Sequence, residues 1–376
     1  MPRRLAALAV LASLLAAAAP GLGAPPPAEA RAYIVLNPAT GETLAERGPD
    51  RELPMASTTK IMTALLVLER ADLDDRYTVP PEAVAVGGST GRLVAGEALS
   101  VRDLLTALLV PSGNDAAVTL ADGLSGSQEA FVDLMNARAR ELGLAHTSFA
   151  NPHGLDAPGH HSSPADLVRL AGVAMRDPVF RHTVASRRAG IPGPNGVGRR
   201  SFDSKNELLA VDPDADGIKT GMTDGAGFTL VAHARRESLG VELYVASIGS
   251  RSSAARARDA QRLLDYGFSE YARARLLAPG TVLGRAQVDG RPGRTIPYRP
   301  ASELDAPIRL GGAPLTQTVV APTEVRPPVE EGQVLGSVTY RQGDRVIGRR
   351  DLVAAESAGS PGLWDRLRAG VESLVP

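Results

Sequence analysis

The sequence predicts an α+β fold: an antiparallel sheet flanked by helices with a helical subdomain, followed by a small all-β domain and a C-terminal amphipathic helix. Three observations lead to this prediction. Strand patterns stand at both ends of residues 31–275, and helical patterns fill the middle. From about Leu277, glycine- and proline-rich segments hold short alternating runs. We therefore expect one domain at 31–275, a second at 276–355, and a linker with a helix at 356–376.

Residues 1–30 have the pattern of a signal peptide. Two arginines precede an apolar run from Leu5 to Ala19, and small residues follow. We expect cleavage near Ala24 or Ala30, which would make the protein an exported one. A retained membrane anchor is the alternative, although the apolar run is shorter than a bilayer span requires. The chain has no cysteine, so its hydrophobic cores must stabilise the exported fold without disulfides.

The sheet of the first domain is predicted from a hairpin and two later strands. Ala32–Asn37 and Glu42–Glu46 flank a turn, and Gly227–Ala234 and Val241–Ile248 follow far downstream. Strands at both ends of one region imply a shared antiparallel sheet. Helical periodicity marks six segments: Ser57–Arg70, Val101–Val110, Asp115–Leu124, Ser127–Leu142, Ser163–Met175 and Ser252–Tyr271.

The second domain has an all-β pattern. Its short alternating runs are Thr281–Val288, Arg294–Tyr298, Ala306–Leu310, Leu315–Val320, Gln333–Tyr340 and Arg345–Leu352. These runs hold no cluster of nucleophile, base and acid, so we assign this domain no chemistry.

The last residues predict an amphipathic helix. After a small-residue linker, Leu363, Leu367, Val371 and Leu374 fall on one helical face. Such a helix can lie in a membrane interface with its apolar stripe down, which makes a membrane surface an expected partner. A helix docked on its own protein is the alternative.

The charged residues argue against a nucleic-acid partner and for an enzyme. The formal net charge is -1, so the chain lacks the basic excess of a nucleic-acid-binding protein. Only three of the 41 cationic side chains are lysines: Lys60, Lys205 and Lys219. Arginine stays protonated under essentially all conditions, whereas a desolvated lysine loses its proton readily. Two of these lysines stand in short motifs, which indicates lysine chemistry. A coding bias that leaves three lysines by chance is the alternative.

The first motif places a serine and a lysine on one helical face. Ser57 precedes an apolar segment that must form a buried helix, and Lys60 follows three residues later. Residues three apart on a helix are neighbours, so the lysine amine can reach the serine hydroxyl. Burial and a nearby cation would lower the lysine pKa and make it a general base. Free N–H groups at the helix start would favour an oxyanion beside the serine. An N-capping serine with a solvated lysine is the alternative.

Two further motifs follow in the chain. Pro111 ends a helix and leaves Ser112-Gly113-Asn114 in a loop, where a hydroxyl and an amide can relay a proton and bind a substrate amide. Ordinary turn chemistry is the alternative here. Lys219-Thr220-Gly221 lies in a predicted edge strand at Gly217–Gly221, where glycine permits close approach of an extended substrate. Thr220 can hold a carboxylate there.

The ordered trio resembles the S-x-x-K, S-x-N and K-T-G motifs of penicillin-binding proteins and serine β-lactamases. The wider phrases, with Asn151-Pro152-His153-Gly154-Leu155-Asp156, are similar to low-molecular-weight D-alanyl-D-alanine carboxypeptidases over about residues 31–275. The resemblance implies a fold of the β-lactamase and DD-peptidase type. It implies removal of the last D-alanine of peptidoglycan stem peptides through a Ser57 acyl-enzyme, and acylation of the same serine by β-lactams. It also implies a bacterial enzyme in the periplasm or on the outer face of the cytoplasmic membrane.

The resemblance also assigns roles to residues. Lys60 would be the base, Ser112 and Asn114 the second-motif pair, and Lys219, Thr220 and Gly221 the third motif. The backbone N–H groups of Ser57 and Met222 would form the oxyanion hole, and Arg251 would bind the terminal carboxylate of the substrate. Many relatives carry histidine where this chain has Met222, which leaves the backbone role intact. Neither a cofactor nor a metal is expected.

Other patterns favour structural interpretations. The G-x-S-x-G match at 87–91 has loop-like flanks, and Asp212–Gly217 lacks the last ligand of a calcium loop. His153, Asp156, His160 and His161 could ligate zinc, but a polar loop under the site is favoured. Lys205 is expected to be a solvated surface lysine, and a place near the cleft is the alternative.

Two rival functions stay open from the sequence. A β-lactamase would need a fast deacylating base, and no obvious Glu-x-x-x-Asn element supplies one. A catalytically idle wall-binding protein of the same fold would not need both Ser57 and Lys60.

Overall fold

The computed structural model describes residues 12–13, 23–291, 293–360 and 362. The chain forms two compact units: Ala24–Glu237 with Val241–Ser269, and Glu270–Pro376 with Met1–Gly23 and Ser238–Gly240. We call the first the catalytic unit and the second the β unit. Most of the predicted signal peptide and all of the predicted C-terminal helix lie outside the described residues.

The catalytic unit contains one five-stranded sheet in the order β3-β2-β10-β9-β8, with every neighbouring pair antiparallel. The strands are β2 (Ala32–Asn37), β3 (Glu42–Arg47), β8 (Ala215–Thr223), β9 (Gly227–Arg236) and β10 (Val241–Ser250). The predicted hairpin and later strands therefore share one sheet, as expected. β8, which carries the third motif, forms an edge of this sheet.

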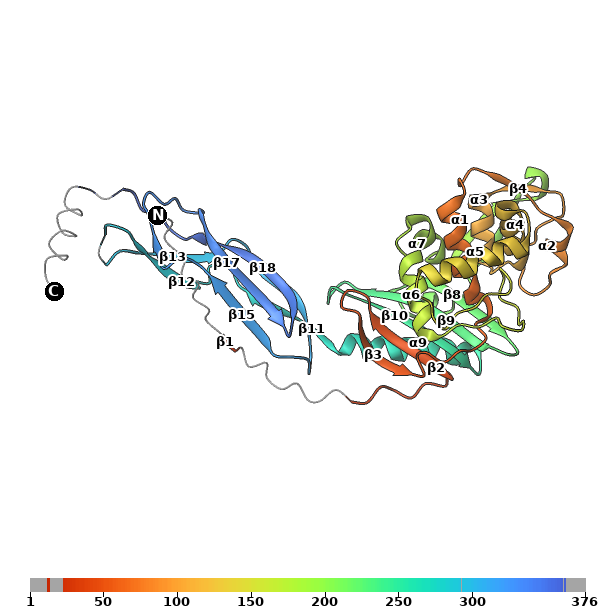
Figure 1. Ribbon diagram of the computed structural model, residues 1–376, viewed down its shortest axis with the longest axis horizontal. Coiled ribbons are helices and arrows are strands. Elements are labelled where there is room, and N and C mark those ends of the chain that lie inside the picture. Colours follow the sequence, from red (N-terminus) through yellow and green to blue (C-terminus); the bar gives the residue numbers. More distant parts are fainter. Residues whose placement is uncertain (1–11, 14–22, 292, 361, 363–376) are drawn as a thin grey trace. The chain divides into compact units, whose positions relative to one another are not determined.

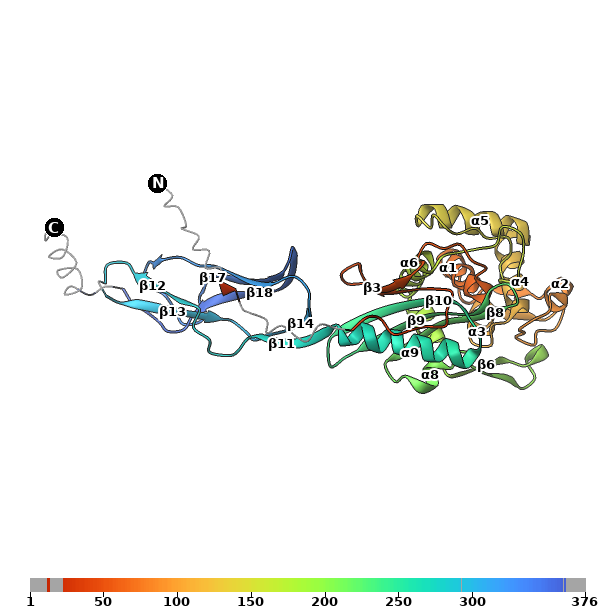
Figure 2. The same ribbon diagram turned by 90° about the horizontal axis from the view of Figure 1, so that it is seen from below.

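Helices cover both faces of the sheet (Figures 1 and 2). Helix α9 (Ser253–Ser269) packs on one face, whereas α6 (Pro164–Ala174) packs on the other. The remaining helices are α1 (Lys60–Arg70), α2 (Pro81–Ala85), α3 (Val101–Leu109), α4 (Asn114–Ser125), α5 (Gln128–Glu141), α7 (Pro178–Val184) and α8 (Leu208–Val211), with the 3₁₀ turns η1 (Ala56–Thr59) and η2 (Pro194–Gly196).

Helix α1 is the centre of the helical part. Its segment Ile61–Val67 is buried all round, because its apolar residues occupy every face of the helix. Helices α3, α4, α5, α6 and α7 contact it. The predicted helix over Ser57–Arg70 is thus present, but its first turn is the 3₁₀ turn η1 rather than α-helix.

Two small antiparallel strand pairs complete the catalytic unit, and the sequence predicted neither. They are β4 (Arg76–Thr78) with β5 (Ala98–Ser100), and β6 (Arg188–Pro192) with β7 (Arg199–Asp203). In β7 the buried positions are Arg200 and Phe202. A strand that points an arginine inward does not show the alternation of apolar and polar residues by which strands are recognised.

The β unit contains a seven-stranded sheet in the order β1-β15-β17-β18-β13-β12-β16 and a two-stranded sheet, β11-β14. Their bounds are β1 (Ala12–Ser13), β11 (Tyr271–Leu277), β12 (Gly284–Val288), β13 (Thr295–Pro300), β14 (Leu304–Arg309), β15 (Leu315–Val320), β16 (Glu324–Val325), β17 (Val334–Gln342) and β18 (Arg345–Ala354). The all-β prediction is confirmed. The helix predicted to reach Tyr271 ends at Ser269. Tyr271 is instead the first residue of β11, which pairs with β14.

Candidate active site

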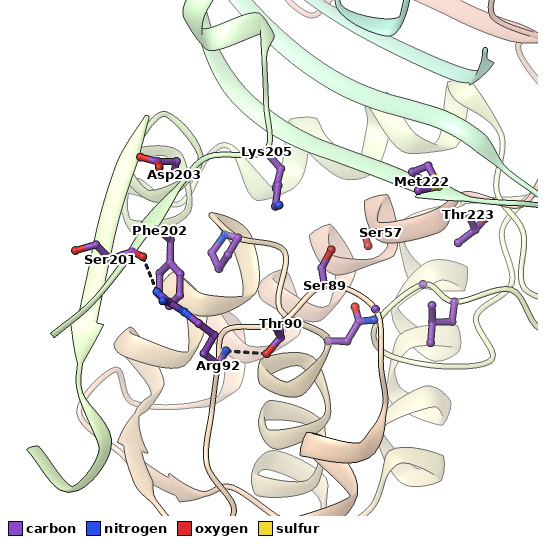
Figure 3. Close-up of a pocket in the computed structure, with 15 residues that line it drawn as sticks. Ser57, Ser89, Thr90, Arg92, Ser201, Phe202, Asp203, Lys205, Met222 and Thr223 are labelled. Atoms are coloured by element: carbon purple, nitrogen blue, oxygen red, sulfur yellow. Dashed lines mark hydrogen bonds between the residues drawn. The ribbon is translucent and has the colours of Figure 1, made fainter. Parts of the chain in front are cut away.

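Ser57 lies in the 3₁₀ turn η1, at the mouth of a cavity of about 640 Å³. Figure 3 shows this cavity between η1, the loop at 88–92 and the β6–β7 hairpin. The residue before Ser57, Ala56, has a positive φ of 50°. Gly221 of β8 backs this turn, because a Cβ at Gly221 would lie 2.7 Å from the Ser57 nitrogen. Glycine at this position therefore lets the edge strand approach the serine backbone.

Lys60 is fully buried and is surrounded by three oxygen atoms. Its Nζ lies 2.9 Å from Ser57 Oγ, 2.6 Å from Asn114 Oδ1 and 2.6 Å from the carbonyl oxygen of His153. Burial lowers the pKa of Lys60 well below its usual value, and the positive charge of Lys219 lowers it further, while Asp115 opposes the shift. The neutral amine is thus favoured far more than in water.

The arrangement around Lys60 orients the neutral amine. A neutral amine has two N–H donors and one lone pair, and the amide and carbonyl oxygens of Asn114 and His153 can only accept. If each takes one N–H, the lone pair faces the Ser57 hydroxyl. This geometry allows Lys60 to remove the proton of Ser57.

The loop that carries His153 is held against α1. Asn151 Oδ1 accepts hydrogen bonds from the backbone of His153 and Gly154, at 3.3 and 2.6 Å, and Thr63 donates to the carbonyl of Pro152 at 2.6 Å. Gly154 has φ +95°, and a Cβ there would lie 2.1 Å from the carbonyl oxygen of Ala56. Glycine is required here because the loop crosses directly over η1.

The second motif joins α3 to α4. Ser112 has a positive φ of 67°, and its buried Oγ has no hydrogen-bond partner among the described residues. Asn114 donates from Nδ2 to the carbonyl of Gly87 at 2.8 Å and from its backbone to the carbonyl of Ser89 at 2.7 Å. Asn114 therefore connects Lys60 to the loop that forms the cavity wall.

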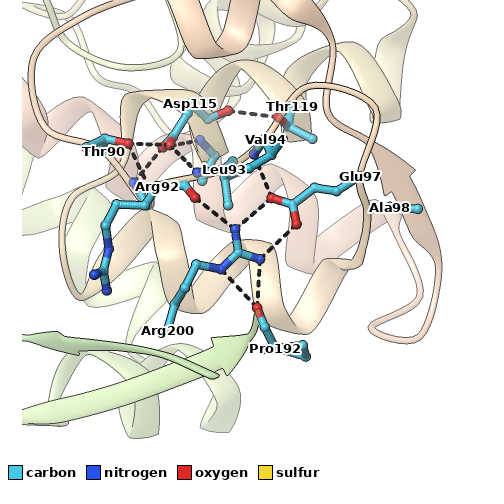
Figure 4. A network of polar contacts seen from close by, with 12 residues as sticks. Thr90, Arg92, Leu93, Val94, Glu97, Ala98, Asp115, Thr119, Pro192 and Arg200 are labelled. Atoms are coloured by element: carbon cyan, nitrogen blue, oxygen red, sulfur yellow. Dashed lines mark hydrogen bonds and ion pairs between the residues drawn. The ribbon is translucent and has the colours of Figure 1, made fainter. Parts of the chain in front are cut away.

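Asp115 organises the rest of that loop (Figure 4). Its carboxylate accepts hydrogen bonds from the backbone of Gly91 at 2.7 Å and Leu93 at 3.1 Å, and from Thr90 Oγ1 at 2.6 Å. The G-x-S-x-G match at 87–91 is thus a cavity-lining loop, and not a strand-to-helix turn.

The third motif follows the β8 edge. Lys219 is buried, and its Nζ donates to the carbonyl of Thr220 at 2.9 Å. Burial, followed by the charges of Arg256 and Lys205, lowers the pKa of Lys219 to about 7. Met222 is exposed and lines the cavity, as does Thr223.

Two arginines after β10, Arg251 and Arg256, lie in different surroundings. Arg251 is exposed in the segment between β10 and α9 and is not among the cavity-lining residues. The buried Arg256, which the sequence analysis missed, donates to the carbonyls of Gly221 at 3.2 Å and Thr229 at 3.4 Å, and pairs with Glu207. The first turn of α9 thus places the Arg256 guanidinium against the third motif, on the face of the sheet opposite to α1.

The third lysine also belongs to this region. Lys205 lines the cavity, although it is exposed as predicted. Its carbonyl oxygen accepts from Thr220 Oγ1 at 3.4 Å. Lys205 is thus a solvated surface lysine, as expected, that also lies beside the cavity.

The histidines near the site have structural contacts. His160 Nε2 lies 2.8 Å from Thr59 Oγ1, and its Nδ1 accepts from the backbone of Ala150 at 2.9 Å. Burial lowers the pKa of His153 to about 3 and that of His160 to about 4. Within the described residues, no group of three or more histidines and carboxylates is arranged to hold a metal ion.

Comparison with known proteins agrees with this geometry. Residues 21–250 match the family model described as D-alanyl-D-alanine carboxypeptidase, peptidase S11. The chain belongs to this family. It is 31% identical to the D-alanyl-D-alanine carboxypeptidase DacC of Escherichia coli, over 91% of this chain and 87% of that protein. It is 33% identical to DacD of Salmonella typhimurium, over 95% of this chain and 94% of that one.

Two solved structures also resemble the chain. Penicillin-binding protein 5 of Haemophilus influenzae matches with a TM-score of 0.64 and 26% identity, over 90% of this chain and all of that one. A Streptomyces DD-transpeptidase matches with a TM-score of 0.62 and 32% identity, over 65% of this chain and 98% of that one. The α+β fold and the serine peptidase class predicted from the sequence are confirmed.

Proposed function

We propose that this D-alanyl-D-alanine carboxypeptidase releases the terminal D-alanine of peptidoglycan stem peptides through an acyl-enzyme on Ser57. The observation that carries the proposal is the position of the Lys60 amine, 2.9 Å from Ser57 Oγ and bound to two oxygens that can only accept. The neutral amine takes the Ser57 proton as the oxygen attacks the carbonyl carbon of the penultimate D-alanine.

The remaining steps use groups around the same serine. The N–H groups of Ser57 and Met222 stabilise the oxyanion, which requires only that the substrate lies along the edge of β8. The buried Ser112 hydroxyl passes the proton from Lys60 to the departing amine, a role that suits its unpartnered Oγ. Water then attacks the ester on Ser57, and Lys60 accepts a proton from the water and returns it to Ser57 Oγ as the bond between that oxygen and the acyl group breaks.

The terminal carboxylate of the peptide binds at Thr220, with Lys219 supplying positive charge behind it. Arg251, to which the resemblance assigns the same carboxylate, is exposed and does not line the cavity, and it stays a candidate for this contact. The substrate lies extended along the edge of β8, and Asn114 binds the substrate amide.

β-Lactams acylate the same Ser57 hydroxyl. The cavity lining contains one carboxylate, Asp203, and Arg188 pairs with it at 3.1 Å. No carboxylate among the lining residues is therefore placed to activate water rapidly, which favours a peptidase over a β-lactamase. An idle wall-binding protein is disfavoured by the intact contact between Ser57 and Lys60.

The test is Ser57→Ala, with Ser89→Ala as the matched control because Ser89 lines the same cavity. We expect Ser57→Ala to lower D-alanine release from a pentapeptide by about 10³-fold or more and to abolish labelling by penicillin, because the covalent step is lost. Wild-type rates of release in Ser57→Ala would refute the proposal.

We also propose that the mature protein begins after residue 24 or 30, acts outside the cytoplasm and associates with the membrane surface through residues 363–376. No helix among the described residues combines the length and apolarity needed to cross a bilayer. Deletion of residues 363–376 should release the protein from membranes in a flotation assay, and unchanged flotation would refute this part.

A further inference from the structure

Asp156 stands at the end of the loop that supports Lys60. This loop begins at Asn151, whose side chain accepts hydrogen bonds from two backbone N–H groups of the loop and donates to the carbonyl of Leu155 at 2.9 Å. One asparagine thus fixes the backbone up to the residue before Asp156. Because the carbonyl of His153 accepts from Lys60, a fixed loop keeps that acceptor in place.

The Asp156 carboxylate holds the turn that follows the third motif. Its Oδ1 accepts a hydrogen bond from Thr223 Oγ1 at 2.7 Å, and its Oδ2 accepts from the backbone of Gly225 at 2.9 Å. A Cβ at Gly225 would lie 2.9 Å from that same Oδ2, so a side chain there would push the two segments apart. One carboxylate therefore connects residues 67 and 69 positions apart in the sequence.

The turn held by Asp156 comes directly after Met222, whose N–H is the proposed oxyanion donor. β8 ends at Thr223, and both Met222 and Thr223 line the cavity beside Ser57 (Figure 3). Thr223 Oγ1 donates to Asp156 and also accepts from the backbone of Ala226 at 3.1 Å. The position of the Met222 N–H thus depends on how the next residue is held.

A second contact holds the same turn from the other side. Arg31, just before β2, donates from Nη2 to the carbonyls of Gly225 at 2.8 Å and Ala226 at 2.6 Å. This contact remains when Asp156 is replaced, so we expect the turn to keep its conformation. The replacement removes only the connection between the turn and the loop at 151–156. A displacement of about 1 Å at such a site can slow a reaction about 100-fold.

We propose that Asp156 is a positioning residue, which holds the end of β8 against the loop so that the Met222 N–H stays in place for the acylation of Ser57. This inference rests on the proposed function of Ser57. The proposed contacts of the bound peptide, at Thr220 and Asn114, do not involve Asp156. The oxyanion forms only as the serine attacks, so loss of Asp156 slows the chemical step and leaves substrate binding nearly unchanged.

The experiment measures D-alanine release from a pentapeptide by Asp156→Ala, with active sites counted by complete labelling with penicillin. Counting the sites makes kcat independent of the fraction of folded enzyme. We expect kcat per labelled site to fall about ten-fold, which is part of the roughly 10²–10³-fold cost of losing a whole oxyanion donor, with KM within about two-fold. Asp156→Asn should keep part of the rate, because its amide oxygen still accepts a hydrogen bond.

A double variant tests whether the contact itself is responsible. Thr223→Val removes the hydroxyl that donates to Asp156. Because both changes break one contact, the double variant should be slowed clearly less than the product of the two single effects. Asp224→Ala is the matched control, since Asp224 is an exposed carboxylate of the same turn and has no hydrogen bond or ion pair with the described residues. It should keep kcat within about two-fold.

A wild-type kcat per labelled site in Asp156→Ala would overturn this inference and leave the proposed function intact. So would an equal loss in Asp224→Ala, or single effects of Asp156→Ala and Thr223→Val that simply multiply. A wild-type enzyme that neither releases D-alanine nor reacts with penicillin would overturn the proposed function as well.

Discussion

Lys219 carries a prediction at the scale of a single residue. Burial and two neighbouring cations lower its pKa to about 7. If its charge is needed to bind the peptide carboxylate, activity should be present below pH 7 and decline as the pH rises through about 7. Lys205→Gln removes one of those cations, which should raise the pKa of Lys219 and move this basic limb to higher pH. The measurement is kcat/KM for the pentapeptide against pH.

A control for this assignment is Lys219→Arg. Arginine keeps its charge at high pH, so the basic limb should vanish even if the rate is lower. A basic limb that stays at the same pH in both variants would exclude Lys219 as its source. The acid limb belongs to Lys60, because its amine must be neutral to act as a base and protonation at low pH removes the lone pair.

Some residue-level features could be predicted from the sequence and others could not. The spacing of Ser57 and Lys60 determines their contact, because both lie within one helical turn. Arg256 gave no signal, because only the packing of α9 against the sheet brings its guanidinium to the carbonyl of Gly221, 35 residues away. The sequence left open whether Lys205 lies beside the cavity, because its contact there joins its carbonyl to Thr220, fifteen residues away.

The β6–β7 hairpin shows how an element is positioned by a buried ion pair. Arg200 donates to both carboxylate oxygens of Glu97, at 2.7 and 2.9 Å, and to the carbonyls of Arg92 and Pro192 (Figure 4). Arg200 and Glu97 are both nearly fully buried. The pair joins residues 103 apart in the sequence, so no local pattern could predict it. It holds the hairpin wall against the loop that carries Arg92.

Breaking this pair should destabilise the catalytic unit. Glu97→Ala leaves a buried guanidinium without its carboxylate, which costs about 3–5 kcal/mol. Asp203→Ala breaks the pair with Arg188 on the same hairpin, where both side chains are more than 70% exposed, and should cost about 0–1 kcal/mol. The measurement is the free energy of unfolding in urea. Equal costs for the two variants would contradict the structural role of the buried pair.

The whole molecule has two compact units, and the alternation of patterns along the sequence indicated this division. Near Leu277 the helical pattern gives way to short alternating runs. This change of periodicity can be predicted from neighbouring residues alone. The order of the strands in the sheet depends instead on contacts between residues far apart in the sequence. β2 at the start of the catalytic unit pairs with β10 at its end, a contact between residues about 200 positions apart that the pattern implies but does not specify.

Because the chain forms two compact units, we predict that the catalytic unit is active without the β unit. Its main core cluster runs from Ala32 to Ile248, and the last buried side chain of α9 is Phe268. The Streptomyces relative, 98% of which matches 65% of this chain, has a similar extent. We propose that residues 31–269 fold and release D-alanine from a soluble pentapeptide with kcat/KM within about two-fold of the mature protein, because every residue that lines the cavity belongs to the catalytic unit. Circular dichroism and steady-state kinetics test this. An aggregated or inactive fragment would show that the catalytic unit depends on the β unit.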